Sequence, residues 1–156
     1  MKTALKSMAA AGALMATTAP AALAQEGMNI VFTHHSSASN TFWQSVQRGF
    51  DEACDRIGAN CQMIFTQTEG AIDQQLANME AALARSPDAI LTSIVDDNAF
   101  DGILSRAVEQ GITVIGVNVD DGEGAAGNPR QAFVGQSFRS AGYSLGEAMS
   151  ENLSRS

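Results

Sequence analysis

Lysine is nearly absent from this sequence of 156 residues, since Lys2 and Lys6 are the only two lysines. Lysine and arginine together number 9, against 17 aspartates and glutamates, so the formal charge is −8. A chain this acidic repels the phosphate backbone of DNA and RNA. The composition therefore excludes nucleic acid as a partner.

Long apolar runs are also lacking, because no stretch after residue 24 approaches the roughly 20 apolar residues that span a membrane. Before it, Lys2 and Lys6 precede an apolar stretch from Met8 to Ala16, and Ala22-Leu23-Ala24 has the small-x-small pattern of a signal cleavage site. We expect residues 1–24 to be a secretory signal peptide that is cleaved after Ala24. Its removal takes away both lysines and leaves an exported chain with a charge of about −10.

Cysteine occurs only at Cys54 and Cys61. Cys54 lies near the end of a predicted helix and Cys61 begins the next predicted strand, and an oxidising compartment favours a disulfide between them. Two buried free thiols are the alternative, because the Cβ geometry decides and the spacing leaves both open. A metal site needs more ligands at suitable spacing, and none lie nearby.

Several motifs of enzyme sites are missing. No G-x-G-x-x-G follows the first predicted strand and no G-x-x-x-x-G-K-[ST] occurs, so dinucleotides and nucleoside triphosphates lack their phosphate cradle. His34 and His35 are adjacent but have no third metal ligand or orienting carboxylate within sequence reach. We therefore expect loop histidines there, with no metal site and no catalytic residue.

Short apolar runs alternate with amphipathic helices along the chain. Continuously apolar runs are typical of a parallel sheet that helices cover on both faces, and the alternation predicts a doubly wound α/β layer. After the glycine-rich segment 120–130, a further strand and helix are predicted. The predicted strands are the apolar runs 30–32, 63–65, 89–95, 112–119 and 132–135. The first predicted helix has the inward positions Phe42, Val46, Phe50, Ala53 and Ile57, and the later helices are predicted at 72–83, 100–108 and 140–153.

In such a sheet, ligands bind beyond the carboxyl ends of the strands. The candidates there are Asn40, Phe42 and Trp43 after the first strand, Ser93, Asp96 and Asp97 after the third, and Asn118 and Asp120 after the fourth. Amides and hydroxyls beside aromatic rings suit a polyhydroxylated ligand. Because Phe42 fits the core register with Val46 and Phe50, Trp43 is the stronger candidate for a ring that faces the ligand. The aspartates are read as helix caps and turns, or alternatively as magnesium ligands.

The order Asn-x-Phe-Trp, "VQRGFDEACDRIG", "SPDAILTSIVDDNAFDGILSRAVEQGITVIGVN" and "FVGQSFRSAGYSLGEAM" resembles the type I periplasmic binding proteins, the sugar-specific subunits of ABC importers, from Met28 onward. The resemblance implies two lobes that close over a sugar without catalysis or cofactor and hand it to a membrane permease. It assigns a sugar hydroxyl to Asn40, ring stacking to Phe42 and Trp43, and polar contacts to Ser93, Asn118 and Gln136. Asn118 stands where ribose binders have an aspartate, so the resemblance does not identify which sugar is bound.

Members of that family resemble one another over a much longer span. We therefore expect residues 25–120 to form an N-terminal lobe and residues 121–156 to contain a hinge, near Asp120 to Gly122, and the start of a second lobe. The chain is then expected to be a fragment, a truncated reading frame or a half-protein that pairs with itself or with another chain. Alternative functions are a ligand-sensing domain for a membrane receptor and a secreted magnesium-dependent phosphoester enzyme that uses Asp96 and Asp120.

Overall fold

The computed structural model describes residues 27–154, and the predicted signal peptide lies outside this range. Five strands form one sheet in the order β2-β1-β3-β4-β5, and every pair is parallel. Their carboxyl ends therefore share one edge. The elements are β1 (Asn29–Ser37), α1 (Thr41–Ile57), β2 (Asn60–Thr66), α2 (Ile72–Leu83), β3 (Ala89–Thr92), α3 (Asp101–Glu109), β4 (Thr113–Asn118), the 3-10 turn η1 (Gly124–Ala126), β5 (Ala132–Gly135) and α4 (Phe138–Leu153).

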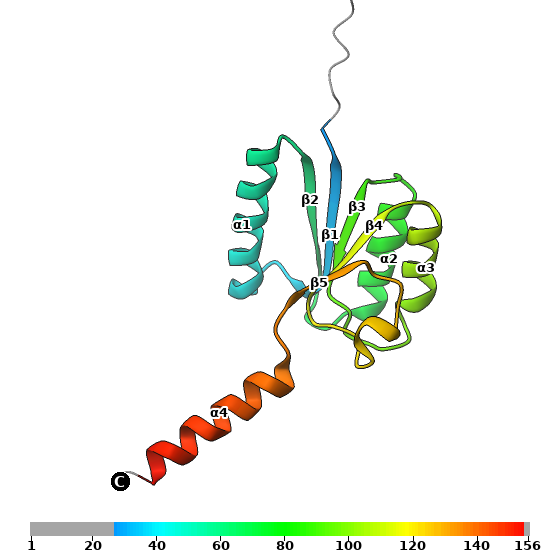
Figure 1. Ribbon diagram of the computed structural model, residues 1–156. Coiled ribbons are helices and arrows are strands. Elements are labelled where there is room, and N and C mark those ends of the chain that lie inside the picture. The colour runs from blue at the N-terminus through cyan, green and yellow to red at the C-terminus, as the bar shows by residue number, and fades with distance from the viewer. Residues whose placement is uncertain (1–26, 155–156) are drawn as a thin grey trace, which may run out of the picture.

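Helices cover both faces of the sheet. Figure 1 shows α1 on one face and α2 and α3 together on the other. The chain reverses its winding direction after β2, so β1 and β3 lie side by side with β2 outside them. This arrangement confirms the α/β doubly wound sheet that the alternating pattern predicts.

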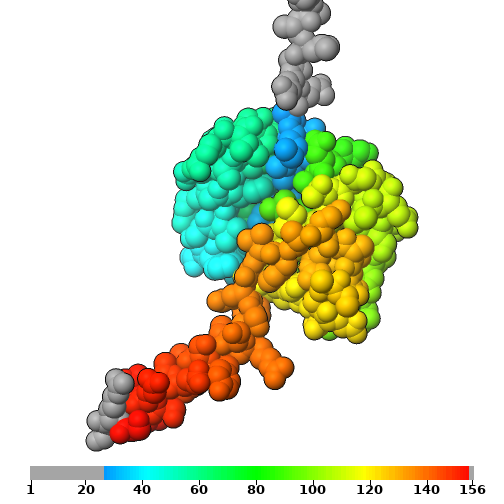
Figure 2. Space-filling view, viewed as in Figure 1, coloured from blue at the N-terminus to red at the C-terminus, as the bar shows by residue number. Residues whose placement is uncertain are grey.

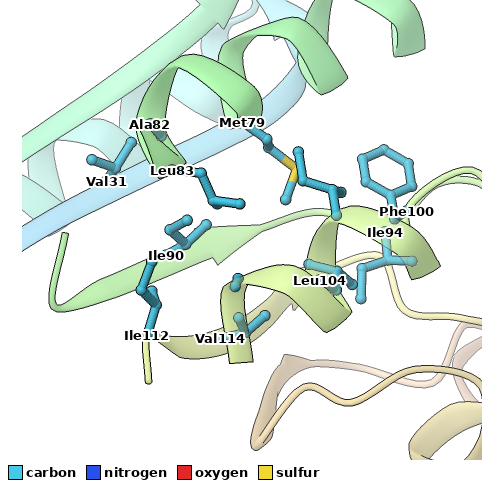
Figure 3. Close-up of a cluster of buried hydrophobic side chains, with 12 residues drawn as sticks. Val31, Met79, Ala82, Leu83, Ile90, Ile94, Phe100, Leu104, Ile112 and Val114 are labelled. Carbon is cyan, nitrogen blue, oxygen red and sulfur yellow. The ribbon is translucent and has the colours of Figure 1, made fainter. Parts of the chain in front are cut away.

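The main core lies between the sheet and the pair α2 and α3 (Figure 3). Val31, Ile90 and Val114 are neighbours across β1, β3 and β4, so they point to the same face. The two helices contribute positions three and four residues apart, as the amphipathic pattern requires. The buried cluster consists of Val31, Met79, Ala82, Leu83, Ile90, Ile94, Phe100, Ile103, Leu104, Ala107, Ile112 and Val114.

The opposite face is packed with rings beneath α1. The Phe32 ring lies 5.8 Å from that of Trp43 and 5.6 Å from that of Phe50. His34 contacts Phe65 of β2 at 4.7 Å. We call Phe32, His34, Trp43, Phe50 and Phe65 the ring cluster.

The inward face of α1 differs from the predicted one. Phe42 and Ile57 were expected inside but are 51% and 61% exposed, and Ala53 is also exposed, whereas Trp43 and Cys54 are buried. Trp43 and Cys54 are separated by about three helical turns, so they lie on one face of the helix. The disulfide fixes Cys54 toward β2, which places Trp43 toward the sheet as well. The inward face is therefore rotated by one residue from the predicted register.

Cys54 and Cys61 form a disulfide with a Cα–Cα distance of 6.2 Å, which confirms the pairing that export favoured. The bond ties the last turn of α1 to the second residue of β2. Between them Gly58 ends the helix in the left-handed region at φ 67°, as the sequence predicts. The disulfide thus holds the shortest helix-to-strand connection on this face of the sheet.

Reduction of this disulfide is expected to lower the free energy of unfolding by about 2.5 kcal/mol, because the bond restricts a short loop in the unfolded chain. Urea unfolding with and without dithiothreitol measures the difference. The paired variant Cys54→Ser, Cys61→Ser is the control, and the reductant should leave its unfolding curve unchanged. An equal response of wild type and variant to the reductant would contradict the prediction.

The segment between β4 and β5 is braced by side chains. Arg130 bonds to Asp120 at 2.6 Å, and buried Asp121 accepts hydrogen bonds from the Glu123 N–H at 2.7 Å and from the Asn128 amide at 3.3 Å. After it, β5 pairs with β4, so the first sheet continues beyond residue 120. The division at residue 120 remains a prediction, and free rotation at Asp120 to Gly122 does not fit this bracing.

The last helix, α4, leaves the layered body at the carboxyl edge of the sheet and points away from it (Figures 1 and 2). Its N-cap is Ser137, whose side chain accepts the Ser140 N–H at 3.2 Å, and the helix begins two residues earlier than predicted. No residue of α4 is buried, and Tyr143, Leu145 and Met149 are exposed. Among residues 27–154, no helix is long and apolar enough to cross a membrane.

Candidate functional site

The carboxyl edge of the sheet brings together loops that are far apart in the sequence. Asn40 and Phe42 follow β1, Asn118 ends β4, and Gln136 follows β5. β3 lies between β1 and β4, so at about 4.8 Å per strand the ends of β1 and β4 are about 10 Å apart. The polar residues predicted at strand ends therefore lie along one edge, spread over the width of a small ligand.

Asn40 is the N-cap of α1. Its Oδ1 accepts the backbone N–H groups of Phe42 at 3.0 Å and Trp43 at 3.4 Å. Its Nδ2 donates to Glu69 Oε2 over a longer distance of 3.5 Å. Because the amide nitrogen carries two hydrogens, this contact leaves one N–H of Asn40 for another acceptor.

The expectation that Trp43 faces the ligand is wrong. Trp43 is 2% exposed, and its ring stacks on His34 with centroids 4.2 Å apart and an interplanar angle of 12°. The rotation of α1 described above turns Trp43 into the ring cluster and turns Phe42 outward. The exposed ring beside Asn40 is therefore Phe42, which contacts Trp43 edge-on at 5.2 Å.

Ser93 was expected at the ligand but is 0% exposed, so that expectation is also wrong. Its Oγ lies 2.9 Å from His35 Nδ1, and its carbonyl accepts Gln75 Nε2 at 2.8 Å. Gln75 of α2 and His35 of β1 thus cover it and satisfy its polar groups. Gln75 was missed from the sequence, although a polar residue three positions after Ile72 on the inward face of a helix was the available signal.

Asn118 and Gln136 remain candidates by position. Asn118 lies in the left-handed backbone region at φ 68°, which asparagine adopts more readily than other side chains and which is enriched at functional sites. Gln136 lines a depression of about 410 Å³ together with Asp120, Phe133 and Phe138. Both residues therefore add polar groups to the carboxyl edge.

Glu69, in the loop after β2, is a second residue that the sequence did not reveal. Its Oε1 accepts the Ser37 N–H at 3.1 Å and the Ser37 Oγ at 3.0 Å. Hydrogen bonds, first from the Ser36 hydroxyl and then from Ser37, hold the pKa of the Glu69 carboxyl below its usual value. Burial lowers the pKa of neighbouring His35, and the Glu69 charge opposes that shift. The edge thus carries an ionised carboxylate beside Asn40.

The strand-end aspartates serve the loops. Asp96 Oδ1 accepts the backbone N–H groups of Asn98 at 3.0 Å and Ala99 at 2.8 Å, and these bonds lower the pKa of Asp96. Asp120 bonds to Arg130, as described above. Within the part of the chain that the structure describes, no group of three or more His, Cys, Asp or Glu side chains is placed to hold a metal ion. The arrangement therefore favours capping and bracing over the magnesium reading.

Two short motifs match enzyme patterns in spacing but not in context. Residues 122–127 read G-x-G-x-x-G, yet they contain the three-residue turn η1 and are not followed by a helix. Residues 142–146 read G-x-S-x-G, but they lie within α4 and not at a turn between a strand and a helix. Neither motif therefore forms a phosphate cradle or a nucleophile elbow.

Comparison with known proteins gives consistent matches. Residues 30–156 match the family model described as periplasmic binding protein domain. The chain is 29% identical over 124 residues to the xylose/arabinose-binding protein of Sulfolobus acidocaldarius, across 76% of this chain and 30% of that protein. It is 31% identical over 77 residues to an ABC transporter periplasmic-binding protein of Escherichia coli, across 49% of this chain and 24% of that protein.

Solved structures are similar as well. The crystal structure of a periplasmic sugar-binding protein of an ABC sugar transporter from Legionella pneumophila has a TM-score of 0.76 and 28% identity, covering 83% of this chain and 46% of that one. A glucose-galactose binding protein from Geobacillus stearothermophilus, at 24% identity and a TM-score of 0.74, shares the fold. The chain thus spans less than half the length of these relatives.

Proposed function

This chain belongs to the periplasmic binding protein family, and from that premise we propose that it binds a monosaccharide at the carboxyl edge of its sheet for delivery to an ABC permease. Relatives at 28% and 29% identity are named as binders of sugars, which supports a sugar as the ligand. They are named as binding proteins, which supports binding without catalysis.

The exposed ring of Phe42 beside the Asn40 amide is the observation that carries this proposal. A ring that is 51% exposed at the start of a helix offers an apolar face to the C–H side of a sugar. The free N–H of Asn40, the amide of Asn118 and the amide of Gln136 supply donors and acceptors for hydroxyl groups. An apolar surface ringed by a few placed polar groups is typical of small-molecule sites.

The sheet edge offers one side of a clamp. We propose that the chain crosses to a second lobe at Gln136 and Ser137, where it leaves β5 and enters α4, and that closure of two lobes traps the sugar. The bracing of Asp120 and Asp121 supports this crossing point over Asp120 to Gly122. We also propose that the chain is exported to the periplasm after cleavage at Ala24, because the family is periplasmic and the first residues read as a signal peptide.

The first experiment measures the melting temperature of the protein with each sugar of a panel, to find the sugar that raises it. The panel is xylose, arabinose, glucose, galactose and allose, and a sugar at 100 times its Kd should stabilise the chain by about 2.7 kcal/mol. Phe42→Ala is expected to weaken that binding about tenfold, or about 1.4 kcal/mol, through the loss of the ring face. Titration calorimetry measures both affinities.

Ile57→Ala is the matched control, since Ile57 is also an exposed apolar residue and lies at the far end of the same helix. It should bind the sugar as wild type does. A panel in which no sugar stabilises wild type would contradict the proposed function. Equal affinities of wild type and Phe42→Ala would contradict the role of the ring.

A further inference from the structure

Glu69 joins two loops at the proposed site. It lies in the loop between β2 and α2, and its carboxylate accepts hydrogen bonds from the last residues of β1 and from the loop that follows β1. They come from the Ser36 hydroxyl, from the Ser37 N–H and Oγ to Oε1, at 3.1 and 3.0 Å, and from Asn40 Nδ2 to Oε2, at 3.5 Å. The loop after β2 also contacts β1 through the backbone, where the Gly70 N–H donates to the His35 carbonyl at 2.7 Å. One side chain thus spans the short segment that leads to Phe42.

That segment, residues 38–40, has no helix or strand of its own. Ala38 and Ser39 are exposed, and Asn40 is joined to α1 by its cap bonds and by the Gln44 N–H, which donates to its carbonyl at 3.0 Å. A carboxylate suits this place because each of its two oxygens accepts more than one hydrogen bond. Its contact with Nδ2 also sets the orientation of the Asn40 amide, with Oδ1 toward the N–H groups of α1.

We propose that Glu69 is a positioning residue that holds residues 37–40 so that the Asn40 amide and the Phe42 ring face the sugar. The assignment rests on the proposed function of the same edge. Glu69 acts through the loop: it fixes the amide orientation, leaves one Asn40 N–H for the ligand and anchors the start of α1. A chain that lacks this carboxylate keeps its core, because Glu69 is exposed and the buried clusters do not include it.

The test combines Glu69→Gln with two readouts. Hydrogen exchange of the Ser37 amide, measured by NMR without ligand, shows how firmly residues 37–40 are held. The affinity for xylose shows the effect on the binding site. We expect Glu69→Gln to speed Ser37 exchange about tenfold and to weaken xylose binding about tenfold, with a melting temperature close to wild type. Glu52→Gln is the control, since it removes the same charge from an exposed pair with Arg56 on α1, and it should change neither readout.

A double-mutant cycle with Ser37→Ala separates positioning from direct contact. If Glu69 acts through the loop, Glu69→Gln weakens xylose binding less in the Ser37→Ala background than in wild type. Equal losses in both backgrounds, with Ser37 exchange unchanged, would overturn the proposal in favour of direct contact. Unchanged Ser37 exchange overturns it even where wild type binds no xylose, so its failure is distinct from a failure of the proposed function. Asn40→Asp, which places a second carboxylate against Glu69, should also speed Ser37 exchange.

Discussion

Trp43→Ala is expected to lower the free energy of unfolding by about 3–5 kcal/mol, whereas Phe42→Ala, one residue away, should cost less than about 1 kcal/mol. Trp43 is 2% exposed and contacts Phe32 and stacked His34, so its removal leaves a cavity beneath α1. Phe42 is exposed and leaves none. Urea unfolding of the two variants measures both values.

Trp43→Phe is the control for the cavity, because it keeps a ring in the same place and should lose less than half as much stability. The prediction also separates two roles for adjacent rings, since Phe42→Ala should weaken sugar binding and preserve stability. If instead Trp43→Ala unfolds like wild type and loses only sugar affinity, the burial of Trp43 in the structure would be contradicted. If Trp43→Ala does not fold, Trp43→Phe carries the comparison.

Acid is expected to destabilise the protein through His34. Burial foremost, and then the charge of His35, lower the pKa of His34 from 6.5 to about 4, against a smaller opposing effect of Glu69. The ring is enclosed by Trp43, Phe32 and Phe65. Its Nδ1 accepts the Ser36 N–H at 3.2 Å, so a proton added to Nδ1 breaks that bond. The folded chain therefore disfavours the charged imidazole.

The sign follows from the lowered pKa. Above pH 6.5 His34 is neutral in both the folded and the unfolded chain and costs nothing. Below pH 6.5 the unfolded chain takes up a proton that the folded chain does not, so stability falls until about pH 4, where the loss levels off. The full contribution is roughly 3 kcal/mol.

Urea unfolding at a series of pH values measures this loss. Because carboxylates also titrate near pH 4, the quantity compared is the difference between wild type and His34→Phe, which keeps a ring and has no proton to gain. The difference should grow as pH falls from 6.5 to 4. Fluorescence of Trp43, the single tryptophan of the chain, gives an independent readout, because a charged imidazole stacked on indole quenches its emission. A fluorescence midpoint near pH 6.5 would contradict the lowered pKa.

Most elements of the fold were predictable from local patterns. The predicted helix 72–83 is α2, the predicted strand 132–135 is β5, and Gly58 ends α1 where expected. These signals are local, since a helix period, a run of apolar residues and a glycine cap are written in neighbouring positions. The location of the candidate site also follows from them, because parallel strands place their carboxyl ends at one edge.

The candidate site was only partly predictable. Phe42 and Trp43 are adjacent, and each belongs to a plausible inward face of α1: one face runs through Phe42, Val46 and Phe50, and the other through Trp43, Phe50 and Cys54. The sequence pattern favours the first face, because with Ala53 and Ile57 it runs through five apolar residues. The prediction that Ser93 contacts the ligand is wrong for a related reason, since Gln75 and His35, which bury Ser93, lie on other elements.

The sequence by itself determined the α/β class, the order of strands and helices, and the edge at which the polar residues gather, because each depends on periodicity within a segment. Only the tertiary structure decided which ring is exposed and that Glu69 ties two loops together. A helix turns by about 100° per residue, so its rotation on the sheet is set by distant contacts. Here those contacts are the Cys54–Cys61 disulfide and the stacking of Trp43 on His34.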